Sequence, residues 1–294
     1  MKVHRLLVQA LLCGLALVVF GCSAAFAQET AQLTKNPADT LVDAPADPQA
    51  GSSPQTSAVT TPEPVDDTSD SKWHIYSVSY LYLPGLHGTI GVLGYNSGFK
   101  ASIWDLLSKA RFGIMGAFDP AYNRWSFPAD FIWLRLKDNQ TIAFDPAYTA
   151  QAKATVSIFT PKVNYLVVRS KKARVYGTAG LRYWHLGTVI TLQPPLVPGS
   201  GGLQPSANWA DFVAGARFVV PLSPKVSIDI LGDAGAGGAN LDYQAASFLN
   251  YQWKPKIVLQ GGWRYMTVHY QGNDQFLFNA TLNGVILGAT YRFR

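Results

Sequence analysis

Apolar and polar side chains alternate along ten stretches of this chain, and this period of two restricts the possible folds more than any other feature. In the last stretch, GVILGATYRFR (284–294), Val285, Leu287 and Tyr291 fall on one face, while small or polar residues and Ile286 fall on the other. A strand that meets two different environments has this pattern. The ten predicted strands cover about 73–84, 111–119, 124–137, 153–168, 174–186, 207–221, 225–235, 244–254, 256–270 and 280–293.

The joints between these strands alternate in length. Those after the second, fourth, sixth and eighth strands are short, namely DPAYNR, SKKA, SPK and KPK, whereas the others are longer and the first, 85–110, is the longest. Short turns at one rim and long loops at the other are typical of a transmembrane barrel. We therefore predict an all-β fold: a closed antiparallel transmembrane β-barrel of about ten strands, with both termini at the short-turn rim, on the periplasmic side.

The N-terminus has the features of an export signal. Lys2 and Arg5 precede an apolar stretch that ends near Phe20, and the triplet 25–27 is an A-x-A cleavage site, so we predict a secretory signal peptide at 1–27. A competing interpretation takes Cys22 as a lipoprotein processing site. The two cysteines, Cys13 and Cys22, both lie in this segment, so the mature chain is expected to lack disulfides.

Two regions of different composition follow. Residues 28–72 are rich in Pro, Ala, Ser and Asp and carry eight acids against two lysines, which predicts a disordered acidic linker, either a plain spacer or a tether to peptidoglycan or a partner. Residues 73–294, the predicted barrel, carry twenty Lys and Arg against ten Asp. The barrel region has no apolar run long enough for a helical membrane span.

The alternation places charged residues on the face without the apolar stripe. A charge that faces lipid near the midplane costs about 2–4 kcal/mol, so these residues are expected to face the lumen. The predicted lumen set is Asp130, Lys162, Arg182, Asp211, Arg217, Asp229, Asp233, Arg264 and Arg292. Four acids and five bases in a narrow barrel predict an ion-pair network that plugs it. A narrow polar pore and a site for a small anionic ligand are the open alternatives.

Aromatic residues are expected to mark the membrane interfaces. The predicted girdle residues are Trp125, Tyr165, Tyr183, Trp253, Trp263 and Tyr291. Pro128 lacks an N–H and predicts a bulge in its strand. Tyr291 and Phe293 end the last strand and resemble the C-terminal assembly signal of outer-membrane barrels, although Arg294 follows them.

Few features point to chemistry. Residues 102–110 have helical spacing and predict a short helix that caps or plugs the mouth. His185 and His269 fall near the outer strand ends, with Asp242 and Asp274 in outer loops, which leaves a rim protease or lipid-modifying enzyme as an alternative. The sequence predicts no metal site, since no His/Cys cluster has ligand spacing. The glycine-rich stretch 232–240 lacks the Lys-Ser/Thr of a phosphate loop, and no cofactor is expected.

Several segments together resemble a bacterial family of outer-membrane β-barrel proteins. They are YLYLPGLHGTIGVLGY, SIWDLLSKARFGIMGAF, NRWSFPADFIWLRL, GLRYWHLG, VAGARFVVPLS, GWRYMTVHY and GVILGATYRF, and they cover nearly all of 73–294. The resemblance implies the fold and a place in the outer membrane of a Gram-negative cell. It implies no activity and no catalytic residues.

The expected function follows from the predicted outer-membrane location and from the charges predicted to fill the lumen. We predict an integral outer-membrane barrel with a structural or narrow, porin-like small-solute permeation role and no catalysis. Its expected partners are outer-membrane lipids and the barrel assembly machinery; an exported monomer meets no nucleic acid. The rivals are the rim enzyme and a soluble secreted ligand-binding β-barrel, which would carry its apolar stripes inside.

Overall fold

The computed structural model describes residues 73–92, 95–141, 149–193, 206–272 and 276–293. The predicted signal peptide and linker lie outside these residues, as does Asp274. The elements are β1 (Trp73–Val92), β2 (Tyr95–Ala101), α2 (Ile103–Lys109), β3 (Ala110–Tyr122), β4 (Trp125–Ser126), β5 (Ala129–Thr141), β6 (Thr149–Arg169), β7 (Arg174–Gln193), β8 (Ser206–Ser223), β9 (Val226–Gly237), β10 (Leu241–Lys254), β11 (Ile257–Gln271) and β12 (Leu277–Arg292).

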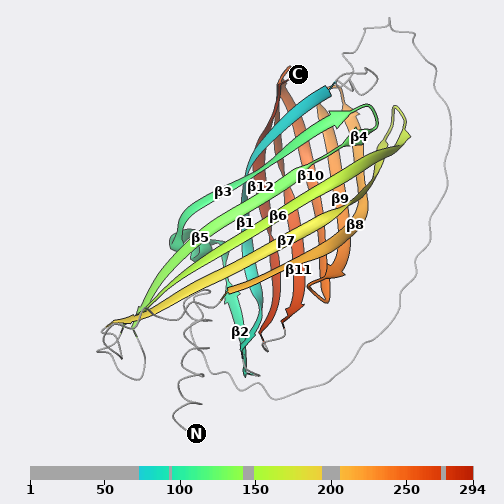
Figure 1. The fold of residues 1–294 in the computed structure, drawn as a ribbon. Coiled ribbons are helices and arrows are strands. Elements are labelled where there is room, and N and C mark those ends of the chain that lie inside the picture. Colours follow the sequence, from blue (N-terminus) through green and yellow to red (C-terminus); the bar gives the residue numbers. More distant parts are fainter. Residues whose placement is uncertain (1–72, 93–94, 142–148, 194–205, 273–275, 294) are drawn as a thin grey trace, which may run out of the picture.

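Ten of the described strands close into an antiparallel barrel, which confirms the predicted fold (Figure 1). β1 pairs with β12 on one side and with β3 on the other, so that Ser77 lies opposite both Tyr291 and Phe118. The first strand begins and the last strand ends at the short-turn rim, where the N–H of Phe293 donates to the carbonyl of Ile75 at 3.0 Å. β2 and β4 are additions to this ring.

The barrel differs from the prediction in three places, two of them joints between strands and one inside a predicted strand. β1 runs on to Val92 and folds back as the unpredicted hairpin strand β2. Pro128 lies in a break between β4 and β5 rather than in a bulge, because its missing N–H ends the ladder there. Only residues 238–240 separate β9 from β10, so the predicted long loop is wrong. Gly238 permits this tight turn, since an added Cβ would lie 2.5 Å from the Cβ of Trp209.

The exterior of the barrel is apolar and aromatic. All six predicted girdle residues are exposed, and neighbouring rings pack against each other on the outside, as Trp125 and Tyr165 do at 4.6 Å. A water-soluble barrel would bury such side chains, whereas lipid solvates them. The exterior therefore fits a membrane. Among the described residues, no helix has the length and hydrophobicity to span one.

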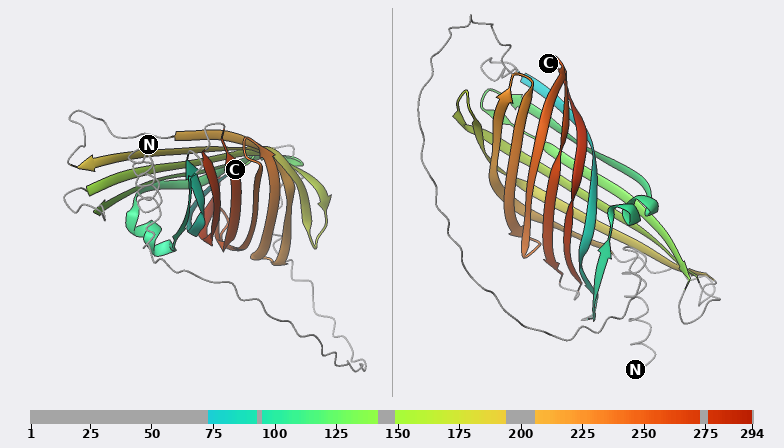
Figure 2. Two further views of the ribbon diagram at one scale, coloured as in Figure 1. Left: turned by 90° about the horizontal axis from the view of Figure 1, so that it is seen from below. Right: turned by 180° about the vertical axis from the view of Figure 1, so that it is seen from behind.

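The end away from the short turns is flared. β5, β6 and β7 extend beyond the other strands there, and their ladders continue to Thr141↔Thr149 and Thr149↔Gln193 (Figures 1 and 2). The predicted helix at 102–110 is present as α2, which packs against β1, β2 and β5. Ser102 caps it by a capping box, and the Ser102 hydroxyl and N–H hold the pKa of the Asp105 carboxyl below its usual value.

The barrel wall is interrupted on one side. The ladder between β1 and β3 ends at Ser79↔Gly116, and β1 finds its next partner on that side only at Leu86↔Ala101 in β2. Beyond Gly116, β3 bends away from β1 toward α2 (Figures 1 and 2). Residues 80–85 of β1 thus line a gap in the wall, below called the β1–β3 gap.

Closure of the barrel depends on a close approach at Gly116. A Cβ there would lie 2.7 Å from the backbone oxygen of Val78, which cannot move aside as a side chain can. Gly116→Ala should therefore destabilise the barrel by about 1–3 kcal/mol, the usual cost of overpacking, measured by thermal melting in detergent micelles. Gly113→Ala is the control, because its Cβ would meet the movable Cδ1 tip of Leu134 at 3.2 Å and the backbone oxygen of Trp133 at an ordinary van der Waals distance of 3.6 Å. Equal losses in the two variants would contradict this account of closure.

Candidate functional site in the lumen

Arg182 lies at the centre of the lumen, held between two carboxylates. Its Nη2 donates to Asp233 at 2.6 Å and its Nη1 donates to Asp242. The three side chains project from β7, β9 and β10, and none is more than 1% exposed. A buried charge needs such pairing, because the desolvation cost of an isolated one is large.

Further donors complete the coordination of both carboxylates. Asp233 also accepts hydrogen bonds from the ammonium of Lys162 on β6 and from Nε2 of Gln244, the latter at 2.7 Å. Asp242 accepts one from the indole N–H of Trp184 at 2.7 Å. Each carboxylate therefore uses both of its oxygens.

Gln244 connects this cluster to a second one. Its Oε1 accepts from Nη2 of Arg264 at 2.8 Å, and the same Nη2 donates to Asp130 at 2.9 Å. The Tyr80 hydroxyl donates to the other oxygen of Asp130 at 2.5 Å. We call the connected set the central network; it consists of Tyr80, Asp130, Lys162, Arg182, Trp184, Asp233, Asp242, Gln244 and Arg264. Its three cations balance its three carboxylates.

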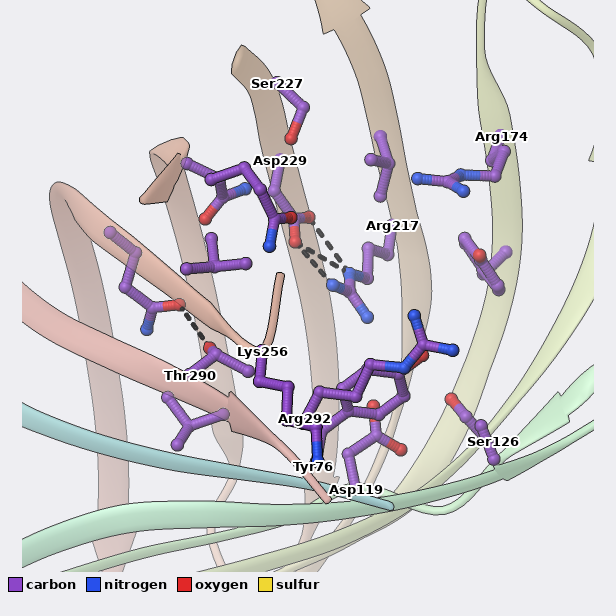
Figure 3. Close-up of a pocket in the computed structure, with 18 of the residues that line it drawn as sticks. Tyr76, Asp119, Ser126, Arg174, Arg217, Ser227, Asp229, Lys256, Thr290 and Arg292 are labelled. Atoms are coloured by element: carbon purple, nitrogen blue, oxygen red, sulfur yellow. Dashed lines mark hydrogen bonds and ion pairs between the residues drawn. The ribbon is translucent and has the colours of Figure 1, made fainter. Parts of the chain in front are cut away.

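The remaining predicted lumen residues lie outside the central network. Arg217 and Asp229 pair with each other, with Nη2 to Oδ2 at 2.5 Å (Figure 3). Asp211, which we expected to join the ion-pair network, instead accepts hydrogen bonds from the N–H of Ala239 at 2.7 Å and from the indole N–H of Trp209 at 3.1 Å. It thereby holds the tight turn between β9 and β10, where a backbone N–H would otherwise lack a partner.

A polar vestibule of about 300 Å³ lies on the short-turn side of the lumen (Figure 3). Its charged lining residues are Asp119, Arg124, Arg174, Arg217, Lys225, Asp229, Lys256 and Arg292. Six cations against two carboxylates make this compartment basic. Arg292, the last of the predicted lumen residues, lies here.

On the long-loop side, the lumen is apolar, whereas the predicted lumen was polar. A cavity of about 500 Å³ lies there, and Trp184, Trp209 and Tyr270 stack beside it, with centroid distances of 5.6 and 4.0 Å. The order along single strands shows the division. On β7, Tyr176 lines the vestibule, Arg182 lies in the central network and Leu186 lines the apolar cavity.

One of the four residues proposed for an enzyme site at the rim does not lie at the rim. Asp242, expected in an outer loop, belongs to β10 and is fully buried against Arg182. His185 contacts Asn208 at 2.6 Å, and His269 is exposed on β11. In the described part of the chain, no group of three or more His, Cys, Asp or Glu side chains could hold a metal ion.

The fold and the lumen together define a transmembrane β-barrel with a charge-filled waist. No protein-family model matches the sequence, and no curated protein matches it significantly.

Among solved structures, the chain is similar to the outer membrane protease OmpT from Escherichia coli, with 11% identity, a TM-score of 0.44 and coverage of 77% of this chain and 100% of that chain. It is also similar to Ail, the attachment invasion locus protein of Yersinia pestis, with 12% identity, a TM-score of 0.32 and coverage of 76% and 100%. A third is the Ralstonia pickettii toluene transporter TbuX, with 9% identity, a TM-score of 0.29 and coverage of 79% and 92%. Similarity of this degree transfers neither mechanism nor ligand to this chain.

Arg182, which is paired with Asp233 and Asp242, should contribute more to stability than Arg217, which is paired with Asp229. Arg182→Ala leaves two buried carboxylates without their shared cation and should cost about 3–5 kcal/mol of unfolding free energy. Arg217→Ala should cost less, because the Arg217 side chain is 31% exposed and water can reach Asp229 after the change. Thermal melting in detergent micelles compares them. A loss for Arg217→Ala equal to or larger than that for Arg182→Ala would contradict the assignment of the buried centre.

Proposed function

We propose that this chain is an integral outer-membrane barrel whose lumen the central network closes to ions and solutes. Its role is structural, and any solute permeation is limited to rare openings of the network. In this proposal the short-turn rim and both termini face the periplasm. The barrel contacts outer-membrane lipids as a monomer, and Tyr291 and Phe293 present the last strand to the assembly machinery.

The observation that carries the proposal is that every charged side chain of the central network is paired with one of opposite charge. Its ion pairs join strands that are not neighbours in the sheet, as Arg264 of β11 and Asp130 of β5 do. Charges balance, and the guanidinium of Arg182 is fully buried, so little driving force exists for water or ions to enter. On the long-loop side of the network, no charged side chain among the described residues lines the apolar cavity, so a permeating ion finds no counter-charge there.

We assign no catalytic role to the barrel. The enzyme alternative needs carboxylates beside histidines at the rim, whereas Asp242 is held in the lumen by Arg182 and Trp184. The aromatic exterior likewise favours a membrane over the soluble ligand-binding alternative.

Planar-bilayer recording tests the closed lumen. The purified protein should give small, rare conductance steps, because the paired charges occupy its cross-section. The double variant Asp130→Ala with Arg264→Ala removes one balanced pair without leaving a lone charge, and it should conduct more often and with larger steps.

The matched control removes the other pair, with Arg217→Ala and Asp229→Ala. These residues line the vestibule outside the central network, so the control should conduct like the unmodified protein. Large, steady steps from the unmodified protein would overturn the closed lumen and favour a porin.

A further inference from the structure

The apolar cavity has the chemistry of a hydrocarbon site. Its volume is about 500 Å³, within the range of small-molecule pockets. Leu134, Val156 and Leu282 contribute from β5, β6 and β12, and among the described residues no charged side chain lines it. Its few hydroxyl groups include those of Thr155, Thr188 and Ser206. Such walls favour an uncharged chain and exclude ions.

The floor of the cavity is fixed by the central network. Tyr80 lines the cavity, and its hydroxyl is already committed to Asp130. Tyr82 lines it too, and its hydroxyl donates to the backbone carbonyl of Arg264 at 3.1 Å. A guest in the cavity therefore meets aromatic rings whose polar ends are satisfied elsewhere, and it cannot pass farther toward the vestibule.

The cavity reaches the outside of the barrel through the β1–β3 gap. Successive residues of β1 point to opposite faces, yet both Leu81, which is 49% exposed, and the buried Tyr82 line it. On the other side of the gap, Ala110, Gly113 and Met115 of β3 line it. A cavity that includes both faces of one strand extends through the wall.

The backbone at the gap is adapted to an environment without water. The N–H of Tyr82 points toward β3 and donates to the thioether sulfur of Met115 at 3.2 Å. Two residues further, on the same side of the strand, Pro84 has no N–H to satisfy. An unpaired backbone donor in lipid would cost several kcal/mol, and these two residues remove that cost without a neighbouring strand.

The part of the gap beside the middle of β3 has an apolar outer border. Phe112 and Ile114 are exposed there, and Leu106 of α2 is buried toward the barrel interior. The charged residues of this region, Asp105, Lys109 and Arg111, lie on α2 and at the start of β3, at the end away from the short turns. Beside Phe112 and Ile114, the gap therefore opens toward lipid chains.

From this geometry we propose that the apolar cavity binds a hydrocarbon chain, which enters sideways from the membrane through the β1–β3 gap. The chain comes either from a membrane lipid or from a free apolar molecule dissolved in the bilayer. The central network stops it at Tyr80. This site rests on membrane insertion, as the proposed function does, but not on the closed state of the lumen.

Electron paramagnetic resonance in nanodiscs tests the site with two probes. One is an alkane that carries a nitroxide, and the other is phosphatidylcholine with a nitroxide on its acyl chain. Val156→Trp fills the cavity. Its control is Ser157→Trp, the next residue of β6, which does not line the cavity. Lipid around any barrel gives a motionally restricted signal, so the difference between the two variants isolates the cavity.

We expect the Ser157→Trp barrel to restrict about one more probe than the Val156→Trp barrel, as one cavity of this size requires. A difference with the phospholipid probe identifies a lipid chain. A difference with the alkane alone identifies a free apolar molecule. Equal signals from both variants with both probes would overturn the proposal.

A second variant covers the case in which Val156→Trp fails to fold, as judged by its heat-dependent mobility in gel electrophoresis. Ala207→Phe then fills the cavity from β8 instead.

Bilayer conductance separates this proposal from the proposal of a closed lumen, because Val156 lies outside the central network. A barrel that conducts refutes the closed lumen alone, whereas loss of the probe difference refutes the hydrocarbon site alone.

Discussion

A strand in a membrane has no water to satisfy its backbone, so each must find a partner strand on both sides. This requirement explains the closed ring, in which the first strand pairs with the last and with β3 over Trp73–Ser79. The same requirement applies at the β1–β3 gap, where β1 has no partner strand on the β3 side. There the N–H of Tyr82 donates to the sulfur of Met115 and Pro84 has no N–H, so neither residue leaves an unpaired backbone donor in the gap.

Alternation along the same strands divides the molecule into two surfaces. Lipid-facing positions carry rings and aliphatic side chains, and inward positions at mid-height carry charges that only pairing can stabilise. Lys162 of β6 reaches Asp233 of β9, and Arg264 of β11 reaches Asp130 of β5. These pairs brace strands that share no backbone hydrogen bonds. The lumen is thereby separated into a basic vestibule and an apolar cavity.

The sequence predicted much of this fold because strand alternation is local. The ten strands and the exposure of Trp125, Tyr165 and the other girdle rings follow from residue parity alone. Partner choice is not local. The glycine-rich stretch before Asp242 predicts a long loop that contains this residue, whereas the chain turns there within three residues. The sequence does not single out Gln244 and Tyr80, because the cost of a lipid-facing charge assigns only ionised side chains to the lumen.

The apolar part of the lumen could not be predicted for a different reason. Alternation places Ile132 and Leu134 on the same face as Asp130, but it does not show where along the barrel axis the polar part of the lumen ends. Only the three-dimensional register shows that the charges of different strands lie at one height and that the positions above them are apolar.

Hydrogen exchange at the indole of Trp184 tests the closed waist most directly. This N–H donates to Asp242 inside the central network, while Trp253, beside the short turn between β10 and β11, is exposed and serves as the reference. With nitrogen-15-labelled tryptophan in nanodiscs and Trp184→Phe for assignment, transfer to heavy water should erase the Trp253 signal at once and leave the Trp184 signal for hours. Exchange of both signals at the same rate would show that water reaches the central network freely and would contradict a barrel sealed by its own ion pairs.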